Sequence, residues 1–165
     1  MLTPQNAQKS IWIRPIILIG VISLFADVAS DMLYAVWPLY LTGNLGASLV
    51  ALGFIEGLAE LIAGIFKISA GRWSDKWGRR RIFVFWGYLF AAVSKPLAGL
   101  ASFWPQALAA RGLDRFGKGI RTAPRDALLA DWAPAGQLGR VFGFHRAMDT
   151  LGATLGPLIT LFILF

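Results

Sequence analysis

The sequence predicts an all-α integral membrane protein whose helices form one bundle. Of its 165 residues, 56% are hydrophobic and only 15% are charged, and the mean hydropathy is +0.60. A soluble domain carries about 45–50% apolar and about 25% charged residues. The apolar residues also gather in long runs with few charges, as expected of a chain solvated by lipid.

Four of these runs are long enough to cross a bilayer, because a spanning helix needs about 20 mostly apolar residues. We predict helices near residues 15–41, 48–69, 82–103 and 142–165. The third ends before the Trp104–Pro105 step, since the residue before a proline is pushed out of the α region.

A cleaved signal peptide is the competing interpretation of the first run. Lys9 and Arg14 precede it, and Val28-Ala29-Ser30 offers small residues for cleavage. The apolar pattern resumes at Met32, however, and a signal peptide would leave the downstream helices unexplained. We therefore interpret the first run as a spanning helix.

The region 106–140 is rich in charge, and hydropathy alone predicts a loop there. The positive-inside rule predicts otherwise. Segments 42–48 and 102–106 carry no charge and are expected outside, whereas the basic segment 71–81 is expected in the cytoplasm with residues 1–14.

A further crossing follows from the charges beyond this region. Without it, Arg140 and Arg146 would lie outside the cell. A helix near 106–126 removes the conflict, and it is tolerable in a membrane only if its charges face protein or water. The sequence thus predicts five spans, the fourth hidden from lipid.

Several classes of function are excluded by composition. The chain has no Cys and one His, so we expect no metal site, no cofactor and no enzymatic activity. The +7 charge suggests nucleic acid, but the basic residues lie in clusters between apolar runs. Gly112–Lys118 matches the start of a phosphate-binding loop, yet Gly119 replaces the required hydroxyl residue and no strand precedes it.

The segment GRWSDKWGRRR, residues 71–81, carries a specific spacing. It fits G-x-x-x-D-[RK]-x-G-[RK]-[RK], which resembles the loop between helices two and three of the major facilitator superfamily. The matching residues are Gly71, Asp75, Lys76, Gly78, Arg79 and Arg80.

Two further segments support this resemblance. Gly152-Ala-Thr-Leu-Gly156-Pro157 is similar to the fifth-helix motif of that family. Arg115-Phe-Gly-Lys118-Gly119 is similar to its fourth-helix motif, with Lys in place of Gln. The resemblance covers about 15–165, which we expect to be a partial N-terminal transmembrane domain.

The resemblance implies a secondary carrier that moves a small solute by alternating access. It places Asp75 at a cytoplasmic gate, where it meets a helix N-terminus of the opposite half, with Gly71 and Gly78 allowing turns and close approach. Family members have twelve helices in two halves. We therefore expect this chain to be a truncated fragment that is not competent alone and lacks its C-terminal half as partner.

Gly-x-x-x-Gly pairs predict close contacts between helices. One pair is Gly53 with Gly57, and the other is Gly152 with Gly156. Pro157 is expected to bend the fifth helix.

Charged residues cluster at one depth. With a rise of about 1.5 Å per residue, Asp27 lies roughly 18 Å from the inner end of its helix, and Asp31 is one turn further out. Glu56 and Glu60 lie roughly 12 and 18 Å from the outer end of theirs, and Arg115 lies roughly 15 Å deep. An isolated charge there is costly, so pairing or protonation is expected.

These charges have two interpretations. In the first, Asp27 or Asp31 binds a proton and faces Arg115 across an aqueous cavity. In the second, permanent ion pairs fix the helix register. Because helices one and four line the central cavity in the family it resembles, the pathway candidates are Asp27, Asp31, Arg111, Arg115 and Lys118. Glu56 and Glu60 are further candidates, although helix two of that family lies at the side of the cavity.

We expect proton-coupled efflux across a cell membrane, with a bacterial inner membrane favoured. The partners expected are the lipid bilayer, a small-molecule substrate and protons, and no nucleic acid. Uptake of an anionic solute is the alternative, motivated by Arg111, Arg115, Lys118 and Arg121 along one helix. A non-transporting membrane interaction protein is the rival from another class.

Overall fold

The computed structural model describes residues 14–164, and these residues are helical except for short connections. The predicted segment 1–14 falls outside them, apart from its last residue. The elements are α1 (Arg14–Leu39), a one-turn π-helix η2 (Tyr40–Asn44), α2 (Leu49–Trp77), α3 (Arg80–Gly99), α4 (Trp104–Trp132) and α5 (Leu138–Leu164). The prediction of an all-α bundle is confirmed.

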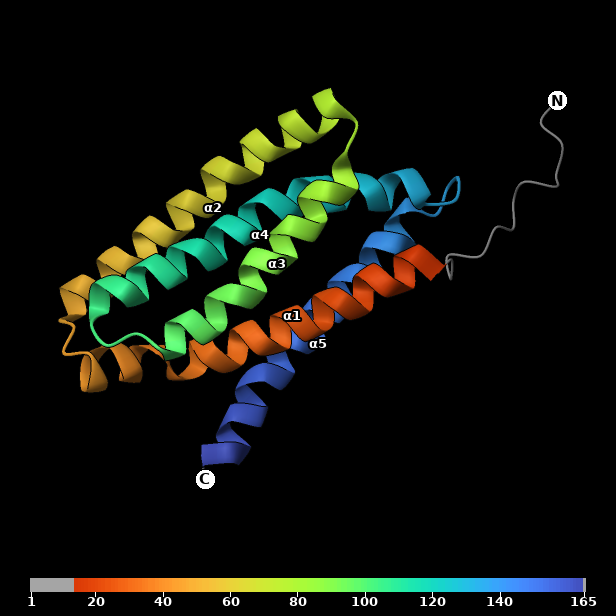
Figure 1. Ribbon diagram of the computed structural model, residues 1–165. Helices are drawn as coiled ribbons and strands as arrows, with labels where there is room; N and C mark the ends of the chain where they lie inside the picture. Colours follow the sequence, from red (N-terminus) through yellow and green to blue (C-terminus); the bar gives the residue numbers. More distant parts are fainter. Residues whose placement is uncertain (1–13, 165) are drawn as a thin grey trace, which may run out of the picture.

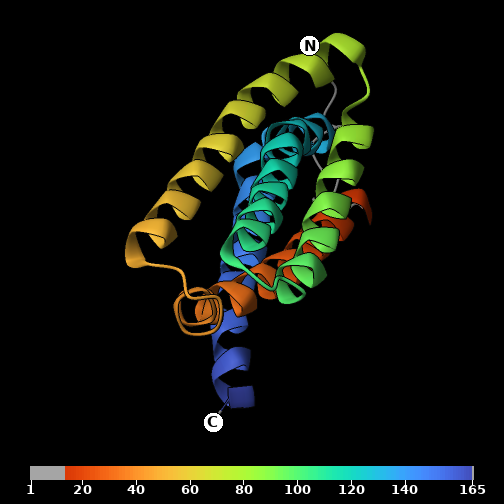
Figure 2. The ribbon, with the colours of Figure 1, turned by 60° about the vertical axis from the view of Figure 1, so that its left-hand side comes forward.

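Helix α4 lies between α2 and α3, and α1 pairs with α5 beside them (Figures 1 and 2). The main contacts join α3 to α4, α2 to α4, and α1 to α5, whereas α1 and α4 touch little. We call the end with the α2–α3 turn the inner end, and the opposite end the outer end. The bundle is thus two packed groups of helices with a gap between α1 and α4.

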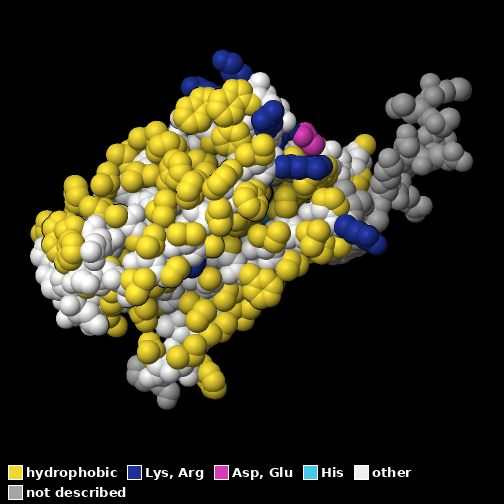
Figure 3. All heavy atoms as spheres, in the orientation of Figure 1, with side chains coloured by type: hydrophobic (Ala, Val, Ile, Leu, Met, Phe, Trp, Pro, Cys, Tyr) yellow, Lys and Arg dark blue, Asp and Glu magenta, His cyan; other side chains and the backbone are white. Residues whose placement is uncertain are grey.

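Among residues 14–164, four helices are long and apolar enough to cross a membrane: α1 continued by η2, α2, α3 and α5. Helix α4 is too polar for this set but is as long as α2, at 29 residues. Eleven of its residues are buried, against at most five in any other helix. Figure 3 shows apolar side chains over most of one face, with charges gathered near the α2–α3 turn.

The helix ends follow local signals. The hydroxyl of Ser48 accepts a hydrogen bond from the Ala51 amide at 3.1 Å and caps α2. At the other end Gly78 has φ +62°, the left-handed conformation that stops a helix. Helix α2 therefore runs eight residues beyond the predicted range 48–69, and most of the basic segment 71–81 is helical instead of a loop.

Helices α4 and α5 also exceed their predicted ranges. Helix α4 ends at Trp132 instead of 126, and α5 begins at Leu138 instead of 142. Hydropathy locates the apolar part of a helix, whereas these ends are polar turns whose backbone hydrogen bonds continue beyond it.

Two apolar clusters close the bundle at its ends. The outer cluster includes Trp37, Leu41 and Ile55, all at most 2% exposed. The inner cluster contains Leu129 and Val141, both fully buried, with Ile16 and Ile19. The polar side chains of the bundle lie between these two clusters.

Glycines set the closest helix contacts. A Cβ on Gly152 would lie 2.7 Å from the carbonyl oxygen of Leu24, and one on Gly156 would lie 2.8 Å from that of Val28. The α1 and α5 backbones therefore approach as only glycine allows. The expected contact at Gly53 and Gly57 is wrong within residues 14–164, where an added Cβ meets nothing within 4 Å.

The α1–α5 contact gives a stability prediction. Replacing Gly156 with Leu places carbon against the Val28 oxygen and the Met32 nitrogen, which are backbone atoms that cannot swing aside. We expect unfolding in detergent to become easier by about 3 kcal/mol. The control Gly57→Ala is expected to leave stability equal or slightly higher. Equal stability of both variants would contradict the close contact.

Candidate functional site

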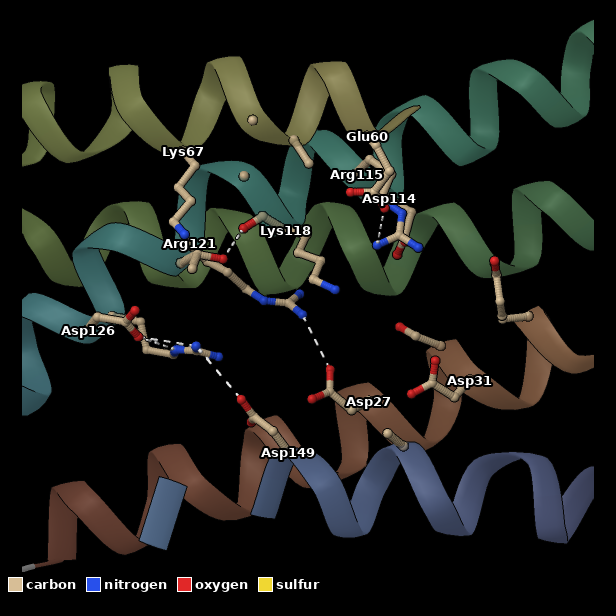
Figure 4. Close-up of a pocket in the computed structure, with 18 of the residues that line it drawn as sticks. Asp27, Asp31, Glu60, Lys67, Asp114, Arg115, Lys118, Arg121, Asp126 and Asp149 are labelled. Carbon is tan, nitrogen blue, oxygen red and sulfur yellow. Dashed lines mark hydrogen bonds and ion pairs between the residues drawn. The ribbon is translucent and has the colours of Figure 1, made fainter. Parts of the chain in front are cut away.

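A cavity of about 570 Å³ lies between α1, α5, α2 and α4, roughly halfway along the helices (Figure 4). This volume is in the range of small-molecule sites. Its charged side chains come from all four helices. They are Lys67, Arg111, Arg115, Lys118, Arg121, Arg125 and Arg146, with Asp27, Asp31, Glu60, Asp114, Asp126 and Asp149.

Toward the outer end, Arg111 is held from two sides. Its Nε and Nη2 donate to the two carboxylate oxygens of Glu56 at 3.0 and 2.8 Å, and its Nη1 lies 3.7 Å from Asp114. Asp114 also lies 3.4 Å from Lys95 Nζ and accepts a hydrogen bond from Ser94 at 3.4 Å. This group joins α2, α3 and α4, and the Arg111 side chain at its centre is only 6% exposed.

At the centre, two arginines of α4 face carboxylates on different helices. Arg115 lies 3.2 Å from Glu60 of α2, and no ion pair joins it to Asp27 or Asp31 of α1 in the described chain. Asp27 instead faces Arg121 at 3.9 Å. Arg121 lies six residues, about 9 Å, deeper along α4 than Arg115. Arg121 therefore reaches Asp27 from a position nearer the inner end of α4 than that of Arg115.

Toward the inner end lies a network that sequence reasoning did not assemble. Ser23 donates to Asp149 at 2.7 Å and accepts from Arg125 at 3.1 Å. Arg125 also contacts Asp126 at 3.2 Å, and buried His145 lies 3.4 Å from Asp149. The signal available was spacing, since Arg125 follows Arg121 by four residues and Asp149 follows His145 by four.

Two charges in the central part of the cavity have no partner. Among residues 14–164, no ion pair is formed by Asp31 of α1 or by Lys118 of α4. Figure 4 shows both side chains reaching into the space between the two helices. Lys67 and Arg146, which line the cavity nearer its inner end, are also without ion pairs in the described residues.

The motif at the α2–α3 turn forms a bridge between three helices. Arg80 donates to Asp75 through Nε at 3.0 Å and Nη2 at 2.7 Å. Its Nη1 donates to Asp131 at the inner end of α4. Asp75 is therefore tied to α3 and, through Arg80, to α4.

The other motif residues at this turn have separate places. A Cβ on Gly71 would lie 3.2 Å from the Ala123 Cβ, so α2 and α4 approach closely there. Gly78 supplies the left-handed turn, and Lys76 and Arg79 are exposed. The turn thus presents cations to solvent beside the Arg80 bridge.

The sequence pattern of the Major Facilitator Superfamily matches residues 19–165. The chain belongs to the major facilitator superfamily. The predicted family is thus confirmed, and the helices described above are those of a multi-pass membrane protein.

Relatives of this major facilitator chain are longer proteins. It is 42% identical over 153 residues to an uncharacterized MFS-type transporter of Methanocaldococcus jannaschii, covering 92% of this chain and 38% of the relative. It is 32% identical over 127 residues to a probable 4-methylmuconolactone transporter of Cupriavidus pinatubonensis, covering 75% and 29%. Multidrug resistance protein 3 of Bacillus subtilis is 30% identical over 89 residues, covering 54% and 17%. The chain spans less than half the length of these relatives.

The charged side chains of the cavity are of mixed sign and form no group typical of a metal site in the part of the chain that the structure describes. Among residues 14–164, no three His, Asp or Glu side chains stand together as metal ligands would. The side chains that meet in the cavity are instead mixed cations and carboxylates, arranged in pairs around an open space. Such a space can accept a charged or polar solute.

Two glutamates on α2 allow a buried ion pair to be compared with an exposed one by their effects on stability. Glu56→Gln leaves Arg111, 6% exposed, without its main partner, and we expect a loss of about 3 kcal/mol in stability. Glu60 is 64% exposed, so Glu60→Gln is expected to lower stability by less than about 1 kcal/mol. Unfolding of both variants in detergent gives the comparison. A reversed order would show that Arg111 is not held as described.

Proposed function

We propose that this chain forms the first helices of a secondary carrier that moves a small solute across a cell membrane by alternating access. The observation that carries the proposal is the charged cavity of about 570 Å³ between α1 and α4, which has an apolar cluster toward each end of the bundle. Substrate sites near the membrane midplane are general among such carriers. The family membership supports the same function.

The complete carrier, in this proposal, includes a second half. The chain covers only 38% of its Methanocaldococcus relative, and alternating access requires one half to move against another. The cavity is bounded on one side by α1 and α5 and on the other by α2 and α4, and its remaining wall would come from the partner half. A bacterial inner membrane is the location we favour.

Proton-coupled efflux is the form of transport we favour. A relative is named a multidrug resistance protein, and Asp27 is a carboxylate in the central layer with a single, loose partner. Its oxygen lies 3.9 Å from Arg121, and its side chain is 21% exposed to the cavity. Protonation of Asp27 would cancel the attraction that holds Arg121 toward α1. Proton binding at Asp27 would thereby be linked to the arrangement of α1 and α4.

Uptake of an anionic solute is less well supported. Three of the four cations that motivated it, Arg111, Arg115 and Arg121, already face carboxylates. Lys118 is the one left for an anionic group. The interaction-protein alternative rests on the open faces at Gly53 and Gly57, and it leaves the charged cavity unexplained.

Replacement of Asp27 tests the coupling. In the complete carrier reconstituted in proteoliposomes, Asp27→Asn is expected to lower flux driven by a pH gradient at least about tenfold, because an amide cannot bind and release a proton. Exchange of solute at equal pH on both sides is the control and is expected to persist. Undiminished pH-driven flux would contradict coupling through Asp27.

A further inference from the structure

We infer that the cavity binds a zwitterionic solute, with the cationic group of the solute at Asp31 and its anionic group at Lys118. The inference deepens the proposed carrier function and rests on it. Its basis is that two charged side chains in the central part of the cavity form no ion pair in the described residues.

The pairs occupy most of the charged lining. Four arginines, at positions 111, 115, 121 and 125, each face at least one carboxylate. Five of the six cavity carboxylates are used in this way. Within residues 14–164, Asp31 is the one cavity carboxylate without an ion pair, and Lys118 is the cation without one at the middle of α4. Lys67 and Arg146 also lack ion pairs but line the cavity nearer its inner end, so Asp31 and Lys118 are the free charges of its central part.

The two side chains stand on opposite walls. Asp31 belongs to α1 and Lys118 to α4, two helices that make few contacts across the cavity. Figure 4 shows both pointing into the gap. Asp31 and Lys118 do not form an ion pair with each other. A solute that contacts both therefore needs a cationic group for Asp31 and an anionic group for Lys118, with a spacer between them.

Both residues are fixed by neighbouring glycines. A Cβ on Gly156 of α5 would lie 2.9 Å from the Asp31 Cβ, so α5 presses directly behind that residue. A Cβ on Gly119, next to Lys118, would lie 2.8 Å from the Ala63 carbonyl oxygen of α2. The backbones that carry the two charges are thus held at set positions, as a solute site requires.

A solute with one charge fits this arrangement poorly. An anion would neutralise Lys118 and leave Asp31 uncompensated, and a cation would do the reverse. A charge without a partner inside a membrane is strongly disfavoured. A zwitterion compensates both and adds no net charge to the pairs around it.

The test compares matched probes. The complete carrier in lipid nanodiscs is titrated with the ω-amino acids from glycine to 6-aminohexanoate, the carboxylates of equal length and the amines of equal length. We expect at least one amino acid to bind about tenfold or more tightly than both of its matched ions. Equal binding of the carboxylate would overturn the inference, as would no binding in any series.

Single substitutions assign the two ends. Asp31→Asn is expected to weaken the preferred amino acid about tenfold or more while leaving the matched carboxylate unchanged. Lys118→Gln is expected to weaken the amino acid similarly while leaving the matched amine unchanged. Lys67→Gln removes a cation from the same cavity and is expected to keep the preference for the zwitterion. Loss of the preference in Lys67→Gln alone would overturn the assignment to Lys118.

A conservative variant guards against misfolding as an explanation. Asp31→Glu keeps the charge and extends the side chain by one methylene, so the preferred amino acid is expected to become shorter. A misfolded protein cannot produce such a shift, and an unchanged optimum would overturn the contact at Asp31.

Flux of the same probes separates this inference from the carrier function. Zwitterion binding that depends on both residues, without flux in proteoliposomes, would support the site and contradict the carrier. Flux of carboxylates that is indifferent to Asp31→Asn would support the carrier and overturn the site. If Asp31→Asn changes only the pH dependence of flux, Asp31 is a proton site and the inference fails.

Discussion

The bundle depends on one constraint, which is that α4 carries its charges through the middle of a membrane protein. An unpaired charge at that depth is strongly disfavoured, so every neighbouring helix supplies a partner. Arg111 meets α2 at Glu56, and Asp114 meets α3 at Lys95. Arg121 faces α1 at Asp27, and Arg125 lies 3.9 Å from Asp149 of α5. These pairs explain the position of α4. Because its charged side chains pair with side chains of four neighbouring helices, α4 lies among those helices instead of facing lipid.

The positions of the glycines explain both the close packing of some helix pairs and the cavity between α1 and α4. Gly117 of α4 lets α3 approach, because a Cβ there would lie 2.6 Å from the Gly87 carbonyl oxygen. Gly152 and Gly156 do the same for α1 and α5. No such contact joins α1 to α4, and the space between them is where Asp31 and Lys118 remain without partners. Tight pairs of helices thus leave a gap between them, and the gap is polar because the charged side chains of α4 and their partners line it.

The sequence predicts the helices better than it predicts their partners. Apolar runs locate α1, α2, α3 and α5, and the distribution of positive charge predicts the crossing of α4, which hydropathy misses. Pairing depends on tilt and register, which one-dimensional depths leave out. Arg115 pairs with Glu60, for example, and the depths alone do not indicate which carboxylate it meets. The Arg80 bridge to Asp131 joins residues 51 apart, and no local pattern indicates it.

The cavity and its ion pairs require α4 to cross the membrane, and side-specific labelling tests this crossing most directly. The chain has no cysteine, so Ser102→Cys before α4 and Ala135→Cys after it each introduce a single thiol. A maleimide that cannot cross membranes is applied to right-side-out and to inside-out vesicles. We predict that the two thiols react from opposite sides, Ser102→Cys from outside and Ala135→Cys from the cytoplasm. Labelling of both from the same side would show that α4 does not cross, and it would contradict both the cavity at the midplane and its ion pairs.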